Sequence, residues 1–544
     1  MIRFGAKVVT ITQLADDTTL FLSDIRSLQI SLNIIYTFFK ASGLRLNYAK
    51  TEIMGLGQKN SRYKHVFDLN WVKDRIYSLG TWFYKDVNMS TQVNYEERWK
   101  KLEAALKRWK CRKLTWYGKI TVIKSLALSL TNYAILALPT PDWFITKVQT
   151  AINDYLWDGK PPKIKFKACI AEHSNGGIKL PDFKSVVLAQ KAYWVMRILD
   201  SELYISDYLQ SFLPRMTIEH FLGCNCKPST LNNNIPLFYR QILQAWFSLQ
   251  QVDDENKEPI IWMNQKVKID NSEVFYKDWY DKGVIYVNDL MEGNSFLSYD
   301  SFVQKYDIRC NFLKFYGLTH ALQKLNTTAF GTLTKELKLI KSREAYWKFT
   351  NSIVEKPSCI KSWKAHYNVD FTDSEWQDIF KHVYEVTKCS KLQEFQLKIL
   401  HKVYATPSYV SNFDKNVNGV CMICNAHNNI IHWFYECATV TTFWQKFEKW
   451  VKNEIDINFR LKRNDIIFTG VAKLNPAIKF SILHAKWHIH RIKFIKYNDN
   501  NSIVGFINFI PKLKEAIISE KHMAISRGSV NNFEKRLGIL ENII

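Results

Sequence analysis

The sequence has few cysteines and lacks a long apolar run free of charge. Ten cysteines in 544 residues is an ordinary number for an intracellular protein, so a disulfide framework is not expected. The longest charge-free apolar stretch, residues 125–141, contains two prolines together with Ser, Thr and Asn, and it predicts no transmembrane helix. Arg3 and Lys7 interrupt the start of the chain, which excludes a typical signal peptide. No internal repeat or low-complexity segment is present.

Acidic residues are also scarce relative to basic ones. The chain has 75 Lys and Arg against 51 Asp and Glu, a formal net charge of +24. Such an excess favours a polyanionic partner, most often nucleic acid, with an anionic membrane surface as the other candidate. Apolar residues reach 47% and charged residues 23%, which excludes a disordered chain and a membrane protein. We therefore expect a soluble intracellular protein of three or four folded units, located in the cytoplasm and nucleus and without membrane partners.

The start of the chain predicts a β-hairpin. A Val-, Ile- and Thr-rich run over Phe4–Leu14 and a second apolar run over Thr18–Leu22 flank Ala15-Asp16-Asp17. Adjacent aspartates have a structural explanation, because Asp tolerates the backbone angles of turns. The functional alternative is that Asp16 and Asp17 hold Mg²⁺, a hard ion that prefers carboxylate and phosphate oxygens. A pair of such ions stabilises the entering and leaving oxygens in phosphoryl transfer.

A helix and a further strand are expected after the hairpin. Ser23 or Asp24 can cap the helix, and Gly43 suits a left-handed C-terminal cap. Leu44–Met54 has an extended pattern. The fold class is therefore α+β at this end of the chain. The apolar residues of the helix recur at spacings of 3 and 4, and they are Ile25, Leu28, Leu32, Ile35 and Phe39.

Residues from Asn94 onward predict basic helices. Between residues 91 and 125 the chain has ten Lys and Arg against three acids, a local net charge of +7. A first helix carries an apolar stripe of Trp99, Leu102, Leu106 and Trp109. A second helix buries a face of Trp116, Ile120, Ile123, Ala127 and Leu130, and it ends before Pro139 and Pro141. We predict a third helix over Asp142–Trp157, and another that follows the turn at residues 176–183 and extends to about Leu199.

Several ordered blocks resemble the reverse transcriptases of LINE-type (non-LTR) retrotransposons. Leu14-Ala15-Asp16-Asp17 with residues 18–22 resembles the aromatic-Ala-Asp-Asp hairpin of that family. Residues 38–52, with Gly43, Asn47 and Lys50, resemble its next block, and Ser78-Leu79-Gly80-Thr81-Trp82 resembles the segment after that. The Gly-Gly-Ile-Lys-Leu-Pro-Asp-Phe turn at 176–183 and a late Cys/His segment occur at comparable places.

This resemblance implies an RNA-directed DNA polymerase, a nucleotidyltransferase that uses Mg²⁺ and copies an RNA template from a DNA primer or target end. It implies that Asp16 and Asp17 are catalytic metal ligands and that Lys50 lies near the departing pyrophosphate. Without the resemblance, Lys50 is a surface lysine at the end of a strand. Leu14 replaces the usual aromatic residue. The family's third aspartate and fingers precede this hairpin, whereas this chain begins 15 residues before Asp16, so we expect a C-terminal portion that is inactive alone.

The segment Cys421-x2-Cys424-x7-His432-x4-Cys437 has the ligand types and short spacings of a tetrahedral structural zinc site. Four protein ligands fill such a site and leave no open position for catalysis. His427 is an alternative fourth ligand, and three buried free cysteines beside an incidental histidine are the structural alternative. The family resemblance supports the first set, because these elements carry a Cys-Cys-His-Cys segment near their C-terminus.

The basic helices predict nucleic-acid binding. A charge-rich helix is usually a solvated face, but here the charge is of one sign, tryptophans interleave with it, and its place matches the family's thumb. A thumb contacts the phosphates of the primer–template duplex without regard to sequence. The tryptophans are expected in the core more than as base-stacking surfaces. The candidate phosphate-binding residues are Lys100, Lys101, Lys107, Arg108, Lys110, Arg112 and Lys113. Basic C-terminal helices add candidate RNA contacts at Lys486, Arg491, Lys493 and Lys496.

The predicted organisation has five parts. Residues 1–90 form a partial palm, 91–200 a helical basic thumb-like domain, 201–340 a helical or irregular connector, 341–460 a helical region with the zinc segment, and 461–544 a basic helical tail. The second hypothesis is a non-catalytic nucleic-acid-binding module, and the third is a translated retrotransposon relic. Cys224-x-Cys226 has no obvious partners for a second zinc site.

Overall fold

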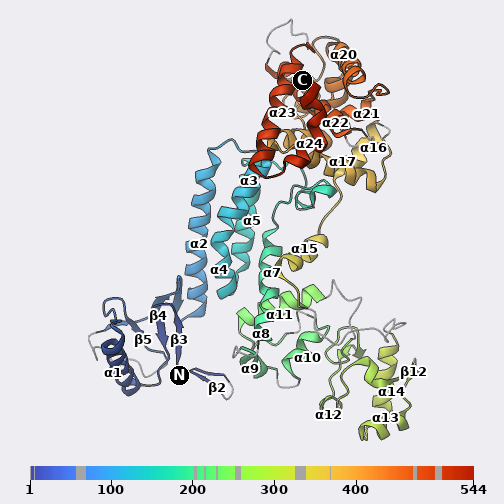
Figure 1. The fold of residues 1–544 in the computed structure, drawn as a ribbon. Coiled ribbons are helices and arrows are strands. Elements are labelled where there is room, and N and C mark those ends of the chain that lie inside the picture. Colours follow the sequence, from blue (N-terminus) through green and yellow to red (C-terminus); the bar gives the residue numbers. More distant parts are fainter. Residues whose placement is uncertain are drawn as a thin grey trace. The chain divides into compact units, whose positions relative to one another are not determined.

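The computed structural model is mostly helical, with small two-stranded β-ladders, and it agrees with an α+β class (Figure 1). The structure describes residues 2–4, 7–56, 69–200, 205–213, 216–227, 229, 231–250, 259–293, 295–324, 339–367, 369–469, 474–495 and 505–543. The chain divides into two compact units, each assembled from separate segments. The first unit comprises residues 1–104, 128–149 and 183–352, and the second comprises residues 105–127, 150–182 and 353–544.

The predicted hairpin is present at the start of the first unit. β3 (Ile11–Leu14) pairs antiparallel with β4 (Asp17–Leu20), so that Leu14 lies opposite Asp17 and Ala15-Asp16 forms a two-residue turn. Ala15 takes a φ of +53° there. The apolar run expected as one strand is divided, because its first part, β2 (Lys7–Val9), pairs with β1 (Ile2–Phe4) instead.

The helix after the hairpin, α1 (Ile25–Ser42), begins and ends at the predicted caps. The Asp24 carboxylate accepts a 2.7 Å hydrogen bond from the Ser27 backbone N–H, which lowers the pKa of Asp24. Gly43 ends the helix with a φ of +76° and donates its N–H to the Phe39 carbonyl. The five residues of the predicted apolar stripe are all half-buried, so this face packs on the protein.

Two more ladders follow α1. β5 (Glu52–Met54) pairs parallel with β6 (Asn70–Val72), and β7 (Arg75–Ser78) pairs antiparallel with β8 (Thr81–Tyr84). Leu79 and Gly80, with φ of +47° and +76°, form the tight turn of the second hairpin. The Asn94 side chain on α2 (Val87–Lys110) bonds both backbone groups of Trp82, which holds this hairpin on the helix. Among the described strands each pairs with one neighbour only, so the hairpin of Asp16 and Asp17 is a separate ladder.

The basic helical region differs from the prediction in its breaks. α2 begins seven residues earlier than expected, at Val87. The predicted second helix is broken at Leu128 into α3 (Trp116–Val122), a π-helical turn η2 (Ile123–Ala127) and α4 (Ser129–Ala137). α5 (Asp142–Trp157) has the predicted bounds. Among the described helices no single one meets the length and apolarity of a bilayer span, although the consecutive segments 116–127 and 129–137 meet them jointly.

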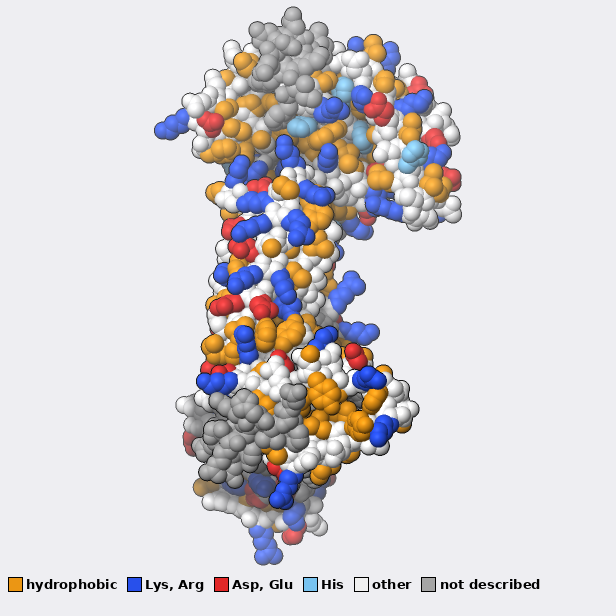
Figure 2. Space-filling view, turned by 90° about the vertical axis from the view of Figure 1, so that its left-hand side faces the viewer, with side chains coloured by type: hydrophobic (Ala, Val, Ile, Leu, Met, Phe, Trp, Pro, Cys, Tyr) orange, Lys and Arg blue, Asp and Glu red, His pale blue; other side chains and the backbone are white. Residues whose placement is uncertain are grey.

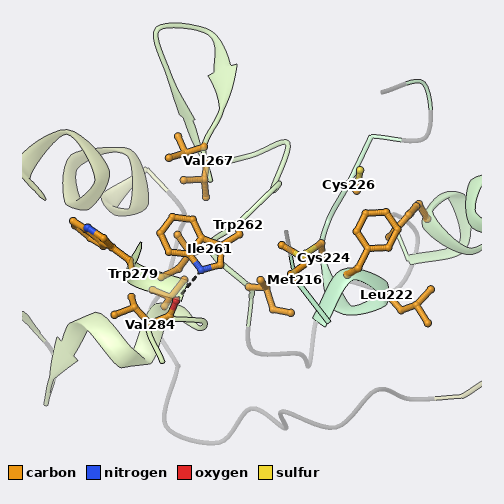
Figure 3. Packing of buried hydrophobic residues seen from close by; sticks show 14 of the residues in the cluster. Met216, Leu222, Cys224, Cys226, Ile261, Trp262, Val267, Trp279 and Val284 are labelled. Carbon is orange, nitrogen blue, oxygen red and sulfur yellow. Dashed lines mark hydrogen bonds between the residues drawn. The ribbon is translucent and has the colours of Figure 1, made fainter. Parts of the chain in front are cut away.

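Residues 195–322 form an aromatic core within the first unit, which the sequence analysis did not identify. Trp262, Trp279, Phe302 and Phe315 are almost fully buried there, and the Trp262 indole N–H donates to the Val284 carbonyl at 2.7 Å (Figure 3). The helices of the first unit from residue 183 onward are α7 (Phe183–Tyr193), α8 (Val195–Ile198), α9 (Ile205–Gln210), α10 (Ile218–Gly223), α11 (Leu237–Gln250), α12 (Lys277–Asp281), α13 (Tyr299–Tyr306), α14 (Phe312–Gln323) and α15 (Ser342–Asn351), with a 3-10 turn η5 (Val287–Leu290). The ladders are β9 (Lys268–Ile269) with β10 (Ser272–Glu273) and β11 (Met291–Glu292) with β12 (Ser295–Phe296).

The second unit is helical. Its middle segment contains α6 (Phe166–Cys169) and a 3-10 turn η3 (His173–Asn175). Helix α18 packs on α17, α21 and α22, and α22 packs in turn on α23 and α24. The later helices are α16 (Ser358–Tyr367), α17 (Asp373–Val386), α18 (Ser390–Leu400), α19 (Pro407–Val410), α20 (Ala438–Glu454), α21 (Arg463–Phe468), α22 (Pro476–Ile495), α23 (Phe509–Ser526) and α24 (Val530–Ile543), with a π-helical turn η7 (His432–Glu436).

The Gly176-Gly177 turn is a junction of the second unit. Gly176 has a φ of +77°, and its carbonyl accepts a 2.8 Å hydrogen bond from the His401 ring. A Cβ on Gly177 would lie 2.0 Å from the Ala171 carbonyl oxygen, so no side chain fits at this position. The Gly177 carbonyl accepts from the Tyr384 hydroxyl. Gly177 is therefore required by the close approach of the Ala171 backbone, and Gly176 by its positive φ and by the Phe380 side chain of α17, 2.9 Å from where its Cβ would lie.

Candidate functional site

A tight turn brings together the first two cysteines of the Cys/His segment. The Cys421 backbone N–H donates to the Ala426 carbonyl at 2.8 Å, and Asn425 N–H returns to the Cys421 carbonyl at 2.9 Å. Asn425 adopts a φ of +54°, which Asn tolerates better than most residues. Val420 and His427 form an antiparallel bridge at the base of the turn. The result is a short loop with Cys421 and Cys424 on it.

A π-helical turn positions the other two residues of the segment. The Asn429 side-chain oxygen accepts the His432 backbone N–H at 2.9 Å and so begins the turn. The Cys437 N–H donates to the His432 carbonyl at 3.0 Å, five residues back, which is the wider hydrogen bond of a π-turn. Cys437 then has extended backbone angles and stands at the N-cap of α20. This wider turn places the His432 and Cys437 side chains beside the cysteine loop.

The four potential ligand atoms form one cluster. They all lie within 4.8 Å of one another. The Cys421 and Cys437 sulfurs are 3.9 Å apart, and the Cys424 sulfur is 3.4 Å from His432 Nε2. Zn–S bonds of ~2.3 Å at tetrahedral angles place two sulfurs ~3.8 Å apart, so this geometry fits a zinc ion. Cys421, His432 and Cys437 are buried and Cys424 is exposed, which leaves one side of the cluster near solvent.

His427, the alternative ligand, is not in the cluster. Its Nε2 lies 2.8 Å from the Ser408 hydroxyl, and its side chain is exposed. The sequence left His432 and His427 open, and the structure brings His432 to the cysteines. Trp444 of α20 donates its indole N–H to the Phe434 carbonyl of the π-helical turn at 2.6 Å.

A lysine from a distant helix supports this cluster. Lys493 of α22 is buried and donates its ammonium to the Trp433 carbonyl at 2.8 Å. Burial raises the pKa of Cys421, with the neighbouring Cys437 thiol adding to the effect. Burial also works against ionisation of Cys437, but its contact with the Thr439 hydroxyl and the charge of Lys493 outweigh burial, and the pKa of Cys437 is lowered. The lowered pKa therefore favours the thiolate at Cys437, the form that binds a metal, whereas burial disfavours the thiolate at Cys421 in the metal-free protein.

Lys493 had been a candidate RNA contact, and that prediction is wrong for two of the four C-terminal residues. Lys486 is fully buried and donates to the Gln396 side-chain oxygen at 2.5 Å and to the Thr469 hydroxyl at 2.9 Å. Both ammonium groups are used inside the protein, where they satisfy buried oxygens, and a phosphate cannot reach them. Arg491 is exposed and stays a candidate, whereas Lys496 lies outside the described residues.

The hairpin residues are at the surface. Asp16 and Asp17 are exposed at the tip of the β3–β4 ladder. Within the described part of the chain, neither belongs to a group of three or more potential metal ligands, so the geometry gives magnesium no support. Lys50 is exposed in a turn, where its backbone N–H donates to the Asn47 side-chain oxygen at 3.2 Å. Their catalytic roles stay predictions.

The basic face of α2 and the loop after it is exposed to solvent. Leu102 and Leu106 are buried and Trp99 and Trp109 half-buried, so the apolar stripe faces inward as expected. The Arg112 guanidinium lies 4.6 Å from the centre of the Trp109 ring. Figure 2 shows Lys and Arg side chains along this face, with acidic and apolar residues between them. The seven predicted phosphate-binding residues are all exposed: Lys100, Lys101, Lys107, Arg108, Lys110, Arg112 and Lys113.

Cys224 and Cys226 belong to the apolar core of the first unit. Both are buried there, and the Cys224 thiol contacts the Met216 sulfur at 3.7 Å (Figure 3). Two residues that support the metal cluster were not recognised from the sequence. Thr439 offers no spacing signal, and Lys493 follows Cys437 by 56 positions on another helix.

Comparison with known proteins gives one informative similarity. No family model matches the chain. A stretch of 156 residues is 28% identical to the transposon TX1 uncharacterized 149 kDa protein of Xenopus laevis. The match covers 28% of this chain and 12% of that protein, so the chain spans only a small part of its relative. This similarity relates the chain to a transposon protein.

Proposed function

We propose that this chain is of retrotransposon origin and corresponds to the part of a LINE-type reverse transcriptase that begins at the Ala-Asp-Asp hairpin. The observation that carries the proposal is the Cys421, Cys424, His432 and Cys437 cluster, whose four ligand atoms lie within 4.8 Å of one another. The relation to a transposon protein supports it. The proposed partners are an RNA template and a DNA primer or target, met in the cytoplasm and nucleus.

In this proposal the cluster holds one structural zinc ion. Three sulfurs and one imidazole nitrogen form a closed tetrahedral set, so the ion stabilises the fold and performs no chemistry. The ion connects the loop at Cys421 to the start of α20 at Cys437. Metal analysis of the purified chain should give one zinc per chain. The double variant Cys421→Ser/Cys424→Ser should lose it, and a zinc content near zero in the wild-type chain would refute the assignment.

The exposed basic face of α2 is the proposed duplex-binding surface. Its lysines and arginines contact phosphates, and each contact releases counterions, so affinity falls with salt. Reversal of Lys100, Lys101, Lys107 and Arg108 to Glu should weaken binding to an RNA–DNA hybrid and flatten the slope of log affinity against log salt. The same number of reversals at the exposed lysines Lys361, Lys446, Lys449 and Lys514, which lie outside α2, is the control. An unchanged slope in the α2 variant would place duplex binding elsewhere.

The proposed catalytic activity is RNA-directed DNA polymerisation at the β3–β4 hairpin. Mg²⁺, when bound, would stabilise the negative charge that develops in phosphoryl transfer. Asp16 and Asp17 would hold it, and Lys50 would contribute a cation near the departing pyrophosphate. Because the chain alone is expected to be inactive, primer extension on poly(rA)/oligo(dT) is measured with the chain joined to the palm and fingers segments that precede the hairpin in the family, with and without Asp16→Asn. Incorporation that the substitution abolishes supports the enzyme.

A non-catalytic nucleic-acid-binding module is the second candidate. The metal cluster and the exposed basic face of α2 favour it, because neither needs the hairpin carboxylates to work. Salt-sensitive hybrid binding with no Asp16-dependent incorporation would support the module over the enzyme.

A further inference from the structure

The second unit contains a basic cavity of about 540 Å³ between α18, α22 and α23. Lys391 comes from α18, Trp487 and Arg491 come from α22, and Lys512 comes from α23. Lys391, Arg491 and Lys512 are exposed, so the cations stand where the cavity meets solvent. This volume is in the range of pockets that take one small ligand.

A second cavity of about 260 Å³ adjoins the first. It is lined by Lys163, Lys398 and Tyr404, and it shares Lys391 and Trp487 with the larger cavity. The two cavities therefore share part of their walls, and we call them together the Trp487 groove. Positions 391, 394 and 398 on α18 and positions 484, 487, 488 and 491 on α22 follow helical spacing, so one face of each helix lines the groove.

Cations outnumber acids in the lining of the groove, and each acid already has a partner. The cations are Lys163, Lys391, Lys398, Arg491 and Lys512, and the acids are Glu394, Glu515 and Glu520. Glu394 accepts the Trp116 backbone N–H at 2.8 Å and pairs with Lys398. Glu520 is buried and accepts from the Thr387 hydroxyl and the Lys388 N–H, at 2.6 and 2.8 Å. Glu515 pairs with Lys512. Lys391 and Arg491 form no salt bridge with any residue that the structure describes, so these two cations are open to an external anion.

Aromatic and imidazole rings form the wall of the groove. Trp487 is half-buried, and its ring meets Phe395 edge-on, with centroids 5.1 Å apart. Nε2 of His484 and of His488 is buried and has no hydrogen-bond partner among the described residues. Burial lowers the pKa of both rings, that of His484 to about 3, so at neutral pH they are uncharged hydrogen-bonding groups. Buried polar atoms without a partner are uncommon in folded proteins, and these two belong to residues that line the cavity.

We propose that the Trp487 groove binds a single strand of nucleic acid, with phosphates at Lys391 and Arg491 and an unpaired base against Trp487. The second unit shows cationic, histidine and apolar side chains together on the face in Figure 2. A cationic path beside an aromatic ring is the combination that single strands use, whereas a duplex keeps its bases stacked inside. The inference rests on the proposed nucleic-acid function and gives the chain a second surface, apart from the basic face of α2.

The test compares two charge-matched double variants of the full chain. Lys391→Gln/Arg491→Gln removes two groove charges, and Lys446→Gln/Lys449→Gln removes two exposed charges on α20. Binding of a fluorescent ten-nucleotide oligouridine is measured by anisotropy over a range of salt. The groove variant should bind about tenfold more weakly, with a salt slope lower by about 1.4, and the α20 variant should bind like wild type. A matching oligodeoxyuridine distinguishes RNA from DNA as the preferred strand.

Two further arms keep the proposal separate from the duplex surface. An abasic strand of equal charge should bind the wild-type chain about tenfold more weakly, because stacking on Trp487 is lost. The α2 reversal variant should lose hybrid binding and keep oligouridine binding, and the groove variant should show the reverse. Equal affinity for abasic and normal strands, or an unchanged affinity in the groove variant, would overturn the proposal. If both variants keep hybrid binding, the duplex-binding role of the α2 face is contradicted instead.

Discussion

Replacement of Lys493 by Met should weaken zinc binding without unfolding the protein. A zinc ion with three thiolates and one neutral imidazole carries a net charge of about −1. Lys493, buried on α22, is the cation whose charge acts on Cys437, Cys421 and Cys424. Opposite unit charges ~5 Å apart at an effective dielectric constant of 20 attract by about 3 kcal/mol.

The expected loss is smaller than this attraction, because water and neighbouring dipoles replace part of the missing charge. Substitutions around metal ligands typically reduce metal affinity 10- to 100-fold, or about 1.4–2.7 kcal/mol. Without metal the same substitution removes a buried ammonium, so the metal-free protein should be as stable as wild type or more stable. Lys493→Met is therefore expected to lower the affinity for zinc and to leave unchanged or raise the stability of the metal-free protein.

Competition with zinc chelators of graded affinity measures the first quantity, and urea unfolding of the metal-free chain measures the second. Lys486→Met is the matched control, because Lys486 is a fully buried lysine of the same helix that bonds Gln396 and Thr469 rather than the cluster. Equal zinc affinity in Lys493→Met and wild type, or an equal loss in both variants, would refute the role of Lys493.

Three more outcomes are expected. Gly177→Ala should destabilise the second unit by at least about 3 kcal/mol, because its Cβ would lie 2.0 Å from the Ala171 oxygen. Gly159→Ala, whose Cβ meets no atom within 4 Å, should cost only about 1–2 kcal/mol of stability, and equal urea midpoints of the two variants would contradict this. Burial lowers the pKa of His401 to about 4, so below pH 6.5 the unfolded chain binds more protons than the folded one. The free energy of unfolding should therefore fall by up to about 3 kcal/mol between pH 6.5 and 4, and a urea midpoint independent of pH would exclude this. Zinc chelation should speed hydrogen exchange at the amides of residues 437–441, since Cys437 begins α20, and unchanged protection there would show that the helix start does not depend on the metal.

Features that depend on neighbouring residues were predictable from the sequence. Asp24 and Gly43 mark both ends of α1 because capping is a local interaction. The bounds of α5 follow from Pro141 before it and Gly159 after it. The metal cluster was predictable because short spacings between ligands of the right type leave few other arrangements.

Features that depend on distant residues were not predictable in this way. Lys486 and Lys493 resemble solvent-exposed positions of a basic helix, but their partners Gln396 and Trp433 lie 90 and 60 positions away. The core at residues 195–322 is built from aromatic residues without a regular period, since short helices and turns deliver them separately. The turn at Gly176 was recognised as a motif, whereas its contact with His401 became visible only in the structure.

The contacts of the Gly176-Gly177 turn also determine when this part of the chain can finish folding during synthesis. His401 follows Gly176 by 225 positions, and Tyr384 follows Gly177 by 207. A ribosome that adds about 5–20 residues per second needs roughly 10–45 s to supply these partners. The segment 183–352 of the first unit emerges during that interval and carries its own core, so it can fold first. The contacts of Gly176 and Gly177 with His401 and Tyr384 therefore form only after residues 183–352 have been made, so this part of the second unit is completed late in synthesis.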